Sequence, residues 1–229
     1  MKKFEEYILW LPSWYPNELE PYNGDFIQRH AVAASYYNEI YVLYIIKDST
    51  GKITKSKKEI IKKSNRLTEV IIYYYSPFKG LLGKLYSDYK YRSIYKKSLK
   101  SYITKKGLPK IVHVHVAMKA GLIALWMLRR FNVPYILSEH WSGLLPNTKP
   151  SFRDLPFYLQ VNYRKILVNA LEISTVSEYL GESIKSSFYI HSYKLIPNVV
   201  DTSIFKPHSL NISQEIKFIH ISSLKFEKN

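Results

Sequence analysis

Short apolar runs alternate with longer, helix-like segments along this chain, and this alternation constrains the fold more than any other feature. Strands are predicted at 7–11, 39–46, 69–75, 110–115, 133–137, 171–176 and 194–196, and helices at 26–37, 81–105, 118–131, 151–169 and after Ser177. A lysine-rich loop is expected at 47–66. Such alternation predicts βαβ units and a parallel sheet. Near-continuous apolar strands fit a sheet covered on both faces. We therefore expect an α/β fold with a doubly wound, Rossmann-like parallel sheet.

Composition limits the classes of protein and partner. The hydrophobic share of 46% permits a sizeable core, and the net charge of +16 favours anionic partners. The chain has no Cys, which excludes disulfides and thiolate metal sites and fits a reducing compartment. The most apolar stretch, 120–128, is far shorter than the roughly 20 residues that span a bilayer. We expect a cytoplasmic protein, soluble or peripheral on the inner membrane face.

In doubly wound sheets, ligands bind beyond the carboxyl ends of the strands. The first such loop leads to Gly24 and Asp25, and the helix after it would direct its positive end toward a ligand. An anion or sugar hydroxyls could bind there. The alternative is an ordinary strand-to-helix loop with Asp25 as the N-cap. No P-loop or Gly-x-Gly-x-x-Gly motif is present.

The second such place is His113-Val114-His115, which ends the fourth apolar strand. Alternation along a strand sends the two imidazoles to the same face. A metal pair is conceivable, but no carboxylate or third histidine lies nearby in sequence. Buried histidines that bond to the backbone are the alternative.

The third place is Ser138-Glu139-His140-Trp141-Ser142-Gly143. A histidine at this edge can donate or accept a hydrogen bond beside a phosphate. Trp141 could stack on a sugar or flat ring. The alternative is a capped turn with an aromatic plug.

Two segments are strongly basic. Residues 52–66 carry seven Lys or Arg, and 84–110 carry nine, interleaved with tyrosines. Basic plus aromatic surface suits an anionic membrane or a nucleic acid backbone. A solvated lysine face is the alternative. No signature of a nucleic-acid binder is present, so we expect no specific nucleic acid partner.

Taken in order, these motifs resemble the N-terminal half of GT-B glycosyltransferases of family 4. The motifs are Trp14-Tyr15-Pro16 with Gly24-Asp25-Phe26, His113-Val114-His115, Ser138-Glu139-His140, Thr175-Val176-Ser177-Glu178, and Ile196-Pro197-Asn198-Val199-Val200-Asp201 with Phe205-Lys206-Pro207. The resemblance implies transfer of a sugar from a nucleotide-sugar donor, usually with retention of anomeric configuration, by an enzyme whose N-terminal domain contacts the acceptor.

Carried over by position, the resemblance assigns roles to individual residues. His140 would be catalytic, beside the donor sugar, while Gly24, Asp25 and Lys228 would lie on the donor phosphate side. The acceptor-side candidates are Trp14, Tyr15, His115, Glu139 and Trp141. No metal or other cofactor is implied, and the chain has no Asp-x-Asp motif. Three residues depart from the family pattern: Asp25 adds an anion, Val199 replaces Gly, and Ser223 replaces an Arg.

The domain expectation follows from the same pattern. Residues 1–207 would form the Rossmann-like domain, and 208–229 a linker and the first strand, 216–222, of a second one that grips the donor. This chain alone should then be inactive. Its acceptor would be a glycan or a lipid-linked intermediate of cell-surface polysaccharide synthesis, with 84–110 facing an anionic membrane. The alternative is a non-catalytic α/β module that binds a phosphorylated or polyanionic ligand.

Overall fold

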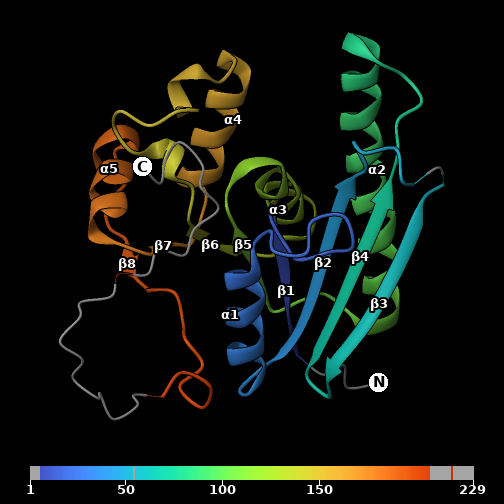
Figure 1. The fold of residues 1–229 in the computed structure, drawn as a ribbon, viewed down its shortest axis with the longest axis horizontal. Coiled ribbons are helices and arrows are strands. Elements are labelled where there is room, and N and C mark those ends of the chain that lie inside the picture. Colours follow the sequence, from blue (N-terminus) through green and yellow to red (C-terminus); the bar gives the residue numbers. More distant parts are fainter. Residues whose placement is uncertain (1–5, 54, 207–217, 219–229) are drawn as a thin grey trace.

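The computed structural model describes residues 6–53, 55–206 and 218. They build one eight-stranded sheet with helices on both faces, in the strand order β3-β4-β2-β1-β5-β6-β7-β8 (Figure 1). The strands are β1 (Tyr7–Pro12), β2 (Glu39–Lys47), β3 (Lys57–Ser64), β4 (Leu67–Tyr74), β5 (Ile111–His115), β6 (Tyr135–Glu139), β7 (Glu172–Thr175) and β8 (Lys194–Leu195). The helices are α1 (Asp25–Ser35), α2 (Gly80–Lys106), α3 (Met118–Phe131), α4 (Phe157–Val168) and α5 (Glu178–Phe188), with short 3₁₀ turns η1 (Ser142–Leu144) and η2 (Phe152–Asp154).

The α/β, Rossmann-like class is confirmed. Every neighbouring pair of strands is parallel except β3 with β4. The central strands are almost wholly buried, as in β2 and β4, because helices shield the sheet on both sides. The strand expected at 216–222, and the whole segment 208–229 apart from Phe218, lie outside the described residues.

Strand β3 corrects the expectation of a loop at 47–66. Its sequence, KKEIIKKS, is mostly exposed, so it lacks the buried apolar run that marks the other strands. It pairs antiparallel with β4 at the edge of the sheet. Lysines on an edge strand discourage further strands from pairing with it.

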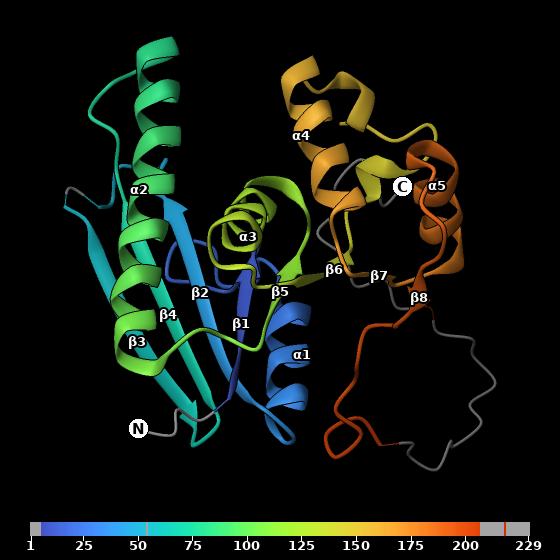
Figure 2. The same ribbon diagram turned by 180° about the vertical axis from the view of Figure 1, so that it is seen from behind.

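Two apolar layers flank the sheet. One packs α2, α3, α4 and α5 against side chains such as Leu9, Leu43 and Val114. The other packs α1, through Ile27 and Ala31, against Trp10 and its neighbours. Figures 1 and 2 show these opposite faces, with α1 nearer the viewer in the first and α2 in the second. The sheet is therefore doubly wound, and the carboxyl ends of its parallel strands lie together at one edge.

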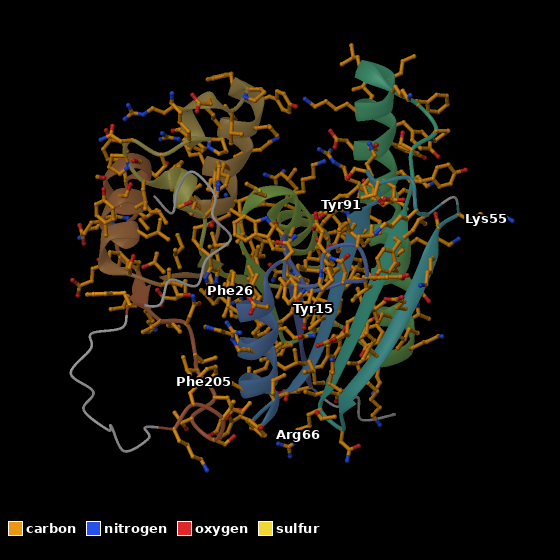
Figure 3. The ribbon with its side chains drawn as sticks, in the orientation of Figure 1. Tyr15, Phe26, Lys55, Arg66, Tyr91 and Phe205 are labelled. Atoms are coloured by element: carbon orange, nitrogen blue, oxygen red, sulfur yellow. The ribbon has the colours of Figure 1, made fainter. Side chains whose placement is uncertain are left out.

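The tyrosines of α2 change the interpretation of its basic, aromatic surface. Tyr91 and Tyr95 are buried against the sheet, and Tyr102 stacks on Tyr41 with ring centroids 3.6 Å apart. Figure 3 labels Tyr91 on the sheet side of α2. Most of the aromatic interleaving in this helix is therefore core packing, which leaves the lysines and a few exposed apolar residues on the outer face.

The helix expected at 151–169 is divided in two. Ser151 and Asp154 form a capping box around η2, and α4 starts only after Pro156. Proline fixes its own φ and restricts the residue before it, which favours a break at this point. In contrast, Ser177 caps α5 as predicted, because its side chain accepts a hydrogen bond from the Leu180 N–H.

Within the described ranges, none of the helices combines the length and the apolar character needed to cross a membrane.

Candidate functional site

Gly24 holds the β1–α1 loop against the start of its helix. Its φ is +70°, and a Cβ at this position would lie 2.7 Å from the backbone carbonyl of Trp14. Both features require glycine. Gly24 is the N-cap of α1, which has no side-chain cap. Asp25 is the first helical residue, which corrects its predicted role as N-cap. In the first turn, the Phe26 N–H donates to the Asp25 carboxylate, and the N–H groups of Ile27 and Gln28 donate to the Gly24 carbonyl.

Asp25 is paired within its own helix. Its carboxylate accepts a hydrogen bond from Arg29 Nη1 at 2.7 Å, and both side chains are about half exposed. Its other oxygen accepts from the Phe26 N–H. Arg29 therefore offsets the negative charge that Asp25 brings to the presumed phosphate side. The positive end of α1 remains available to an anion.

Four histidines pack together where α1 lies against the sheet, and we call them the histidine cluster. They are His30 of α1, His113 and His115 of β5, and His140, which follows β6. The ring centroids of His113 and His115 are 4.0 Å apart, and those of His115 and His140 are 5.9 Å apart. The shared face of His113 and His115 was predicted from strand alternation, and these distances confirm it. Figure 3 labels Phe26 at the top of α1, and its ring centroid lies 4.8 Å from that of His140.

Most ring nitrogens of the cluster lack a partner. Both nitrogens of His115 and of His140, and Nε2 of His30, are buried without a hydrogen bond to any described residue. His113 is different, because its Nε2 lies 2.8 Å from Ser138 Oγ. Buried polar groups are normally satisfied, so the unpaired nitrogens of His140 call for a partner that the described residues do not supply.

Burial keeps the cluster neutral at physiological pH. Desolvation, aided by neighbouring histidines, lowers the pKa of His140 to about 4 and that of His113 to about 3. The same causes place the pKa of His115 well below its ordinary value. A neutral His140 can donate from one nitrogen and accept at the other. That suits a sugar hydroxyl better than a diphosphate, which would favour a cation.

Glu139 anchors the turn that presents His140. Its side chain is fully buried and accepts hydrogen bonds from the backbone N–H groups of Ala117, His140 and Trp141, and from the Tyr163 hydroxyl. Burial raises the pKa of this carboxyl, while the four donors act in the opposite direction. Glu139 therefore ties β6 to the starts of α3 and η1 and to the middle of α4. We assign it as a positioning residue instead of an acceptor contact.

Tyr15 belongs to a second buried carboxylate network. Its hydroxyl donates to Glu69 Oε1 at 2.8 Å, and Gln28 Nε2 donates to both oxygens of Glu69 at 3.0 and 3.1 Å. Tyr15 and Glu69 are both completely buried. The network ties the β1–α1 loop to β4. Sequence reasoning missed Glu69 and Gln28, because nothing in the chain order indicates that they meet.

The remaining acceptor-side candidates lie inside or at the edge of the core. Trp14 is half-buried between the two apolar layers, and Trp141 is buried with its ring against Gly143. His115 is completely buried. The structure thus brings Gly24, Asp25 and His140 toward the carboxyl edge of the sheet, whereas the acceptor-side candidates are buried or half-buried in the core. Lys228 lies outside the described residues.

In the part of the chain that the structure describes, no three His, Cys, Asp or Glu side chains converge as a set that could hold a metal ion.

Comparisons with known proteins identify relatives of this chain. The sequence model of Glycosyltransferase Family 4 matches residues 53–204, more than half of the chain. A Bacillus subtilis (strain 168) protein described as a teichuronic acid biosynthesis glycosyltransferase, TuaC, is 26% identical over 183 residues, which cover 78% of this chain and 46% of TuaC. The solved sucrose-phosphate synthase (tll1590) of Thermosynechococcus elongatus shares the fold, with a TM-score of 0.62 and 15% identity over 89% of this chain and 51% of that one. The chain thus spans about half the length of each relative.

Proposed function

The chain belongs to Glycosyltransferase Family 4, and we propose that it is the acceptor-side half of an enzyme that moves a sugar from a nucleotide-sugar donor to a glycan or lipid-linked acceptor. The observation that carries this proposal is the approach of α1 to His140 at the carboxyl edge of the sheet, marked by the 4.8 Å between the Phe26 and His140 rings. Ligands of doubly wound sheets bind at this edge. An uncapped helix start and a neutral imidazole face it together.

We infer that the start of α1 and the imidazole of His140 have separate tasks. Transfer breaks the bond between the sugar's anomeric carbon and the donor diphosphate and forms a bond to an acceptor hydroxyl oxygen, whose proton passes to the departing diphosphate. The departing diphosphate gains negative charge, and the positive end of the α1 dipole, which begins after Gly24, can stabilise it. The ring nitrogens of His140 are buried and have no partner among the described residues, and they would hydrogen-bond the sugar. Lys228 would add a cation on the diphosphate side, as the family resemblance implies.

The finer parts of the proposal rest on resemblance. The description of TuaC supports a role in cell-surface polysaccharide synthesis. We propose that the anomeric configuration is retained, as the family resemblance implies. Because the relatives are about twice as long, we also propose that this chain alone has no measurable transferase activity and that a further domain binds the nucleotide. Nothing in this scheme needs a metal or another cofactor.

We also propose that the enzyme works in the cytoplasm, peripheral to the inner membrane face, with the basic outer side of α2 toward anionic lipid. The exposed cations of this side include Arg92, Lys96, Lys97 and Lys100, and each cation near such a surface contributes about 1 kcal/mol. Co-sedimentation with vesicles tests this. Binding that needs anionic lipid supports it, and equal binding to neutral vesicles excludes the electrostatic account.

Sugar transfer by the full natural polypeptide is the direct test of function. Release of nucleoside diphosphate from a panel of nucleotide sugars, dependent on an acceptor fraction, is the expected result. The rival hypothesis is a non-catalytic module that binds a phosphorylated or polyanionic ligand, and it predicts binding without turnover. A third hypothesis, nucleic acid binding, predicts a steep salt dependence of affinity for specific strands.

A further inference from the structure

A second ligand position lies beyond the carboxyl ends of β2 and β4. There the β2–β3 connection, the β4–α2 loop and the first turns of α2 enclose an open cleft of about 920 Å³. We call it the lysine cleft, and its lining includes Lys47, Lys79, Lys84, Lys119, Phe78 and Ser87. Its volume is within the range typical of small-molecule sites, on the order of 300–1,000 Å³.

The charge of the lysine cleft is unbalanced in favour of cations. Two carboxylates also line it, and both are occupied. Asp48 accepts hydrogen bonds from the Ile53 N–H and from the N–H and hydroxyl of Thr50. Asp88 pairs with Lys119 at 2.7 Å. Among the described residues, Lys47, Lys79 and Lys84 form no ion pair within this cleft, so their charges remain available to a ligand.

The start of α2 adds to this positive field. The helix begins at Gly80 with no side-chain cap and no acidic residue in its first turn. Its first N–H groups and the positive end of its dipole therefore have no anionic side chain beside them. Ser87 also lines the cleft, is only 5% exposed, and its hydroxyl has no hydrogen-bond partner among the described residues. An anionic ligand beside the first turn of α2 would complement these N–H groups.

One apolar side chain, Phe78, lines the cleft beside α2 and is 51% exposed. Leu81, Leu82 and Leu85 lie outside this lining on the first turns of α2 and are between 60% and 74% exposed. Neighbouring exposed leucines beside lysines suit a molecule with a charged group and an apolar part. The same cations would also hold the phosphate of a soluble sugar.

From these observations we propose that the lysine cleft binds the phosphate group of a phosphorylated acceptor. The identity of the ligand as an acceptor rests on the proposed function, whereas phosphate binding does not. The cleft lies at the end of β2, and His140 follows β6, three strands away in the sheet. Three strand spacings correspond to about 14 Å, which leaves room for the sugar portion of the acceptor between its phosphate and the reacting hydroxyl.

Three probes test this proposal on the chain itself: decyl phosphate, glucose 6-phosphate and decanol, titrated by calorimetry without any donor. At least one phosphate should bind, and decanol should not. The variant Lys79→Gln/Lys84→Gln should weaken phosphate binding by about tenfold, since it removes two charge-assisted partners. The control variant Lys62→Gln/Lys63→Gln removes the same charge from exposed positions toward the opposite end of the sheet and should change affinity less than about twofold.

The outcomes separate the sources of phosphate. Binding of decyl phosphate alone supports a lipid-linked phosphate, and binding of glucose 6-phosphate supports a soluble one. The proposal is overturned if neither phosphate binds, if decanol binds as tightly, or if both double variants lose affinity equally. Any of these results leaves the transferase proposal standing. Conversely, a full natural polypeptide without transferase activity would leave phosphate binding in the cleft intact.

Discussion

Gly24 lies against the main chain of Trp14, so that a Cβ on residue 24 would approach the Trp14 carbonyl carbon and oxygen to 2.7 Å. The contact places the start of α1 close to the β1–α1 loop and leaves its helix end uncapped. This one residue therefore connects the packing of the loop with the geometry of the presumed phosphate side.

Gly24→Ala should lower the free energy of unfolding more than Gly51→Ala does. The substitution adds both backbone strain at φ +70° and a steric clash, for a loss of about 2–4 kcal/mol in the free energy of unfolding. Gly51→Ala is the matched control, because its φ is +79° but nothing lies within 4 Å. It should cost about 1–2 kcal/mol. Urea denaturation measures both, and equal losses would show that the Trp14 contact is unimportant.

Removing the Glu139 carboxylate should weaken the turn that carries His140. Glu139→Gln places an amide among four donors and should cost about 2–4 kcal/mol. Tyr163→Phe removes one donor and should cost about 1–2 kcal/mol. Glu18→Gln breaks only an exposed ion pair with Lys57 and should cost less than about 1 kcal/mol. If Glu139→Gln unfolded at the wild-type urea midpoint, the anchoring role would be wrong.

The order of strands and helices was largely predictable, because buried β strands carry uninterrupted apolar runs. The exceptions have local causes. Strand β3 was hidden by its exposed lysines, and Pro156 divided a segment whose apolar pattern favours one helix. The position of His140 at the carboxyl edge was also predictable. Its anchoring was not, since two of the four donors to Glu139 come from Ala117 and Tyr163, which are 22 and 24 residues away.

The histidine cluster should make the fold sensitive to acid. Burial lowers the pKa of each of its four imidazoles, so below about pH 6.5 the unfolded chain binds protons that the folded chain excludes. The contribution of the cluster to the free energy of unfolding should therefore be fully present at pH 7 and fall as the pH drops from about 6.5 toward 4.5. Each such histidine contributes up to about 1.4 kcal/mol per pH unit. The raised pKa of Glu139 opposes the trend by at most one proton.

Urea titrations at several pH values between 7 and 4.5 measure this slope. His30→Asn should reduce it by at most one proton, because this variant removes one member of the cluster whose pKa is lowered by burial. A wild-type stability that stays constant across this range would contradict the burial of neutral imidazoles.

Tyr15→Phe separates a structural role from an acceptor contact. The change leaves Glu69 without its hydroxyl donor and should reduce the free energy of unfolding by about 1–3 kcal/mol. The KM for the acceptor should remain within about twofold, because Tyr15 is completely buried. A large rise in this KM without a loss of stability would instead restore Tyr15 as an acceptor contact.

The central claim is that His140 faces the donor sugar at the edge of the sheet, and the transfer rate of His140→Ala in the full natural polypeptide tests it most directly. We expect kcat to fall by about 100-fold or more, since the variant removes polar contacts to the reacting sugar. His191→Ala serves as the control and should keep the wild-type kcat. A His140→Ala enzyme that folds and transfers sugar at the wild-type rate would contradict the account.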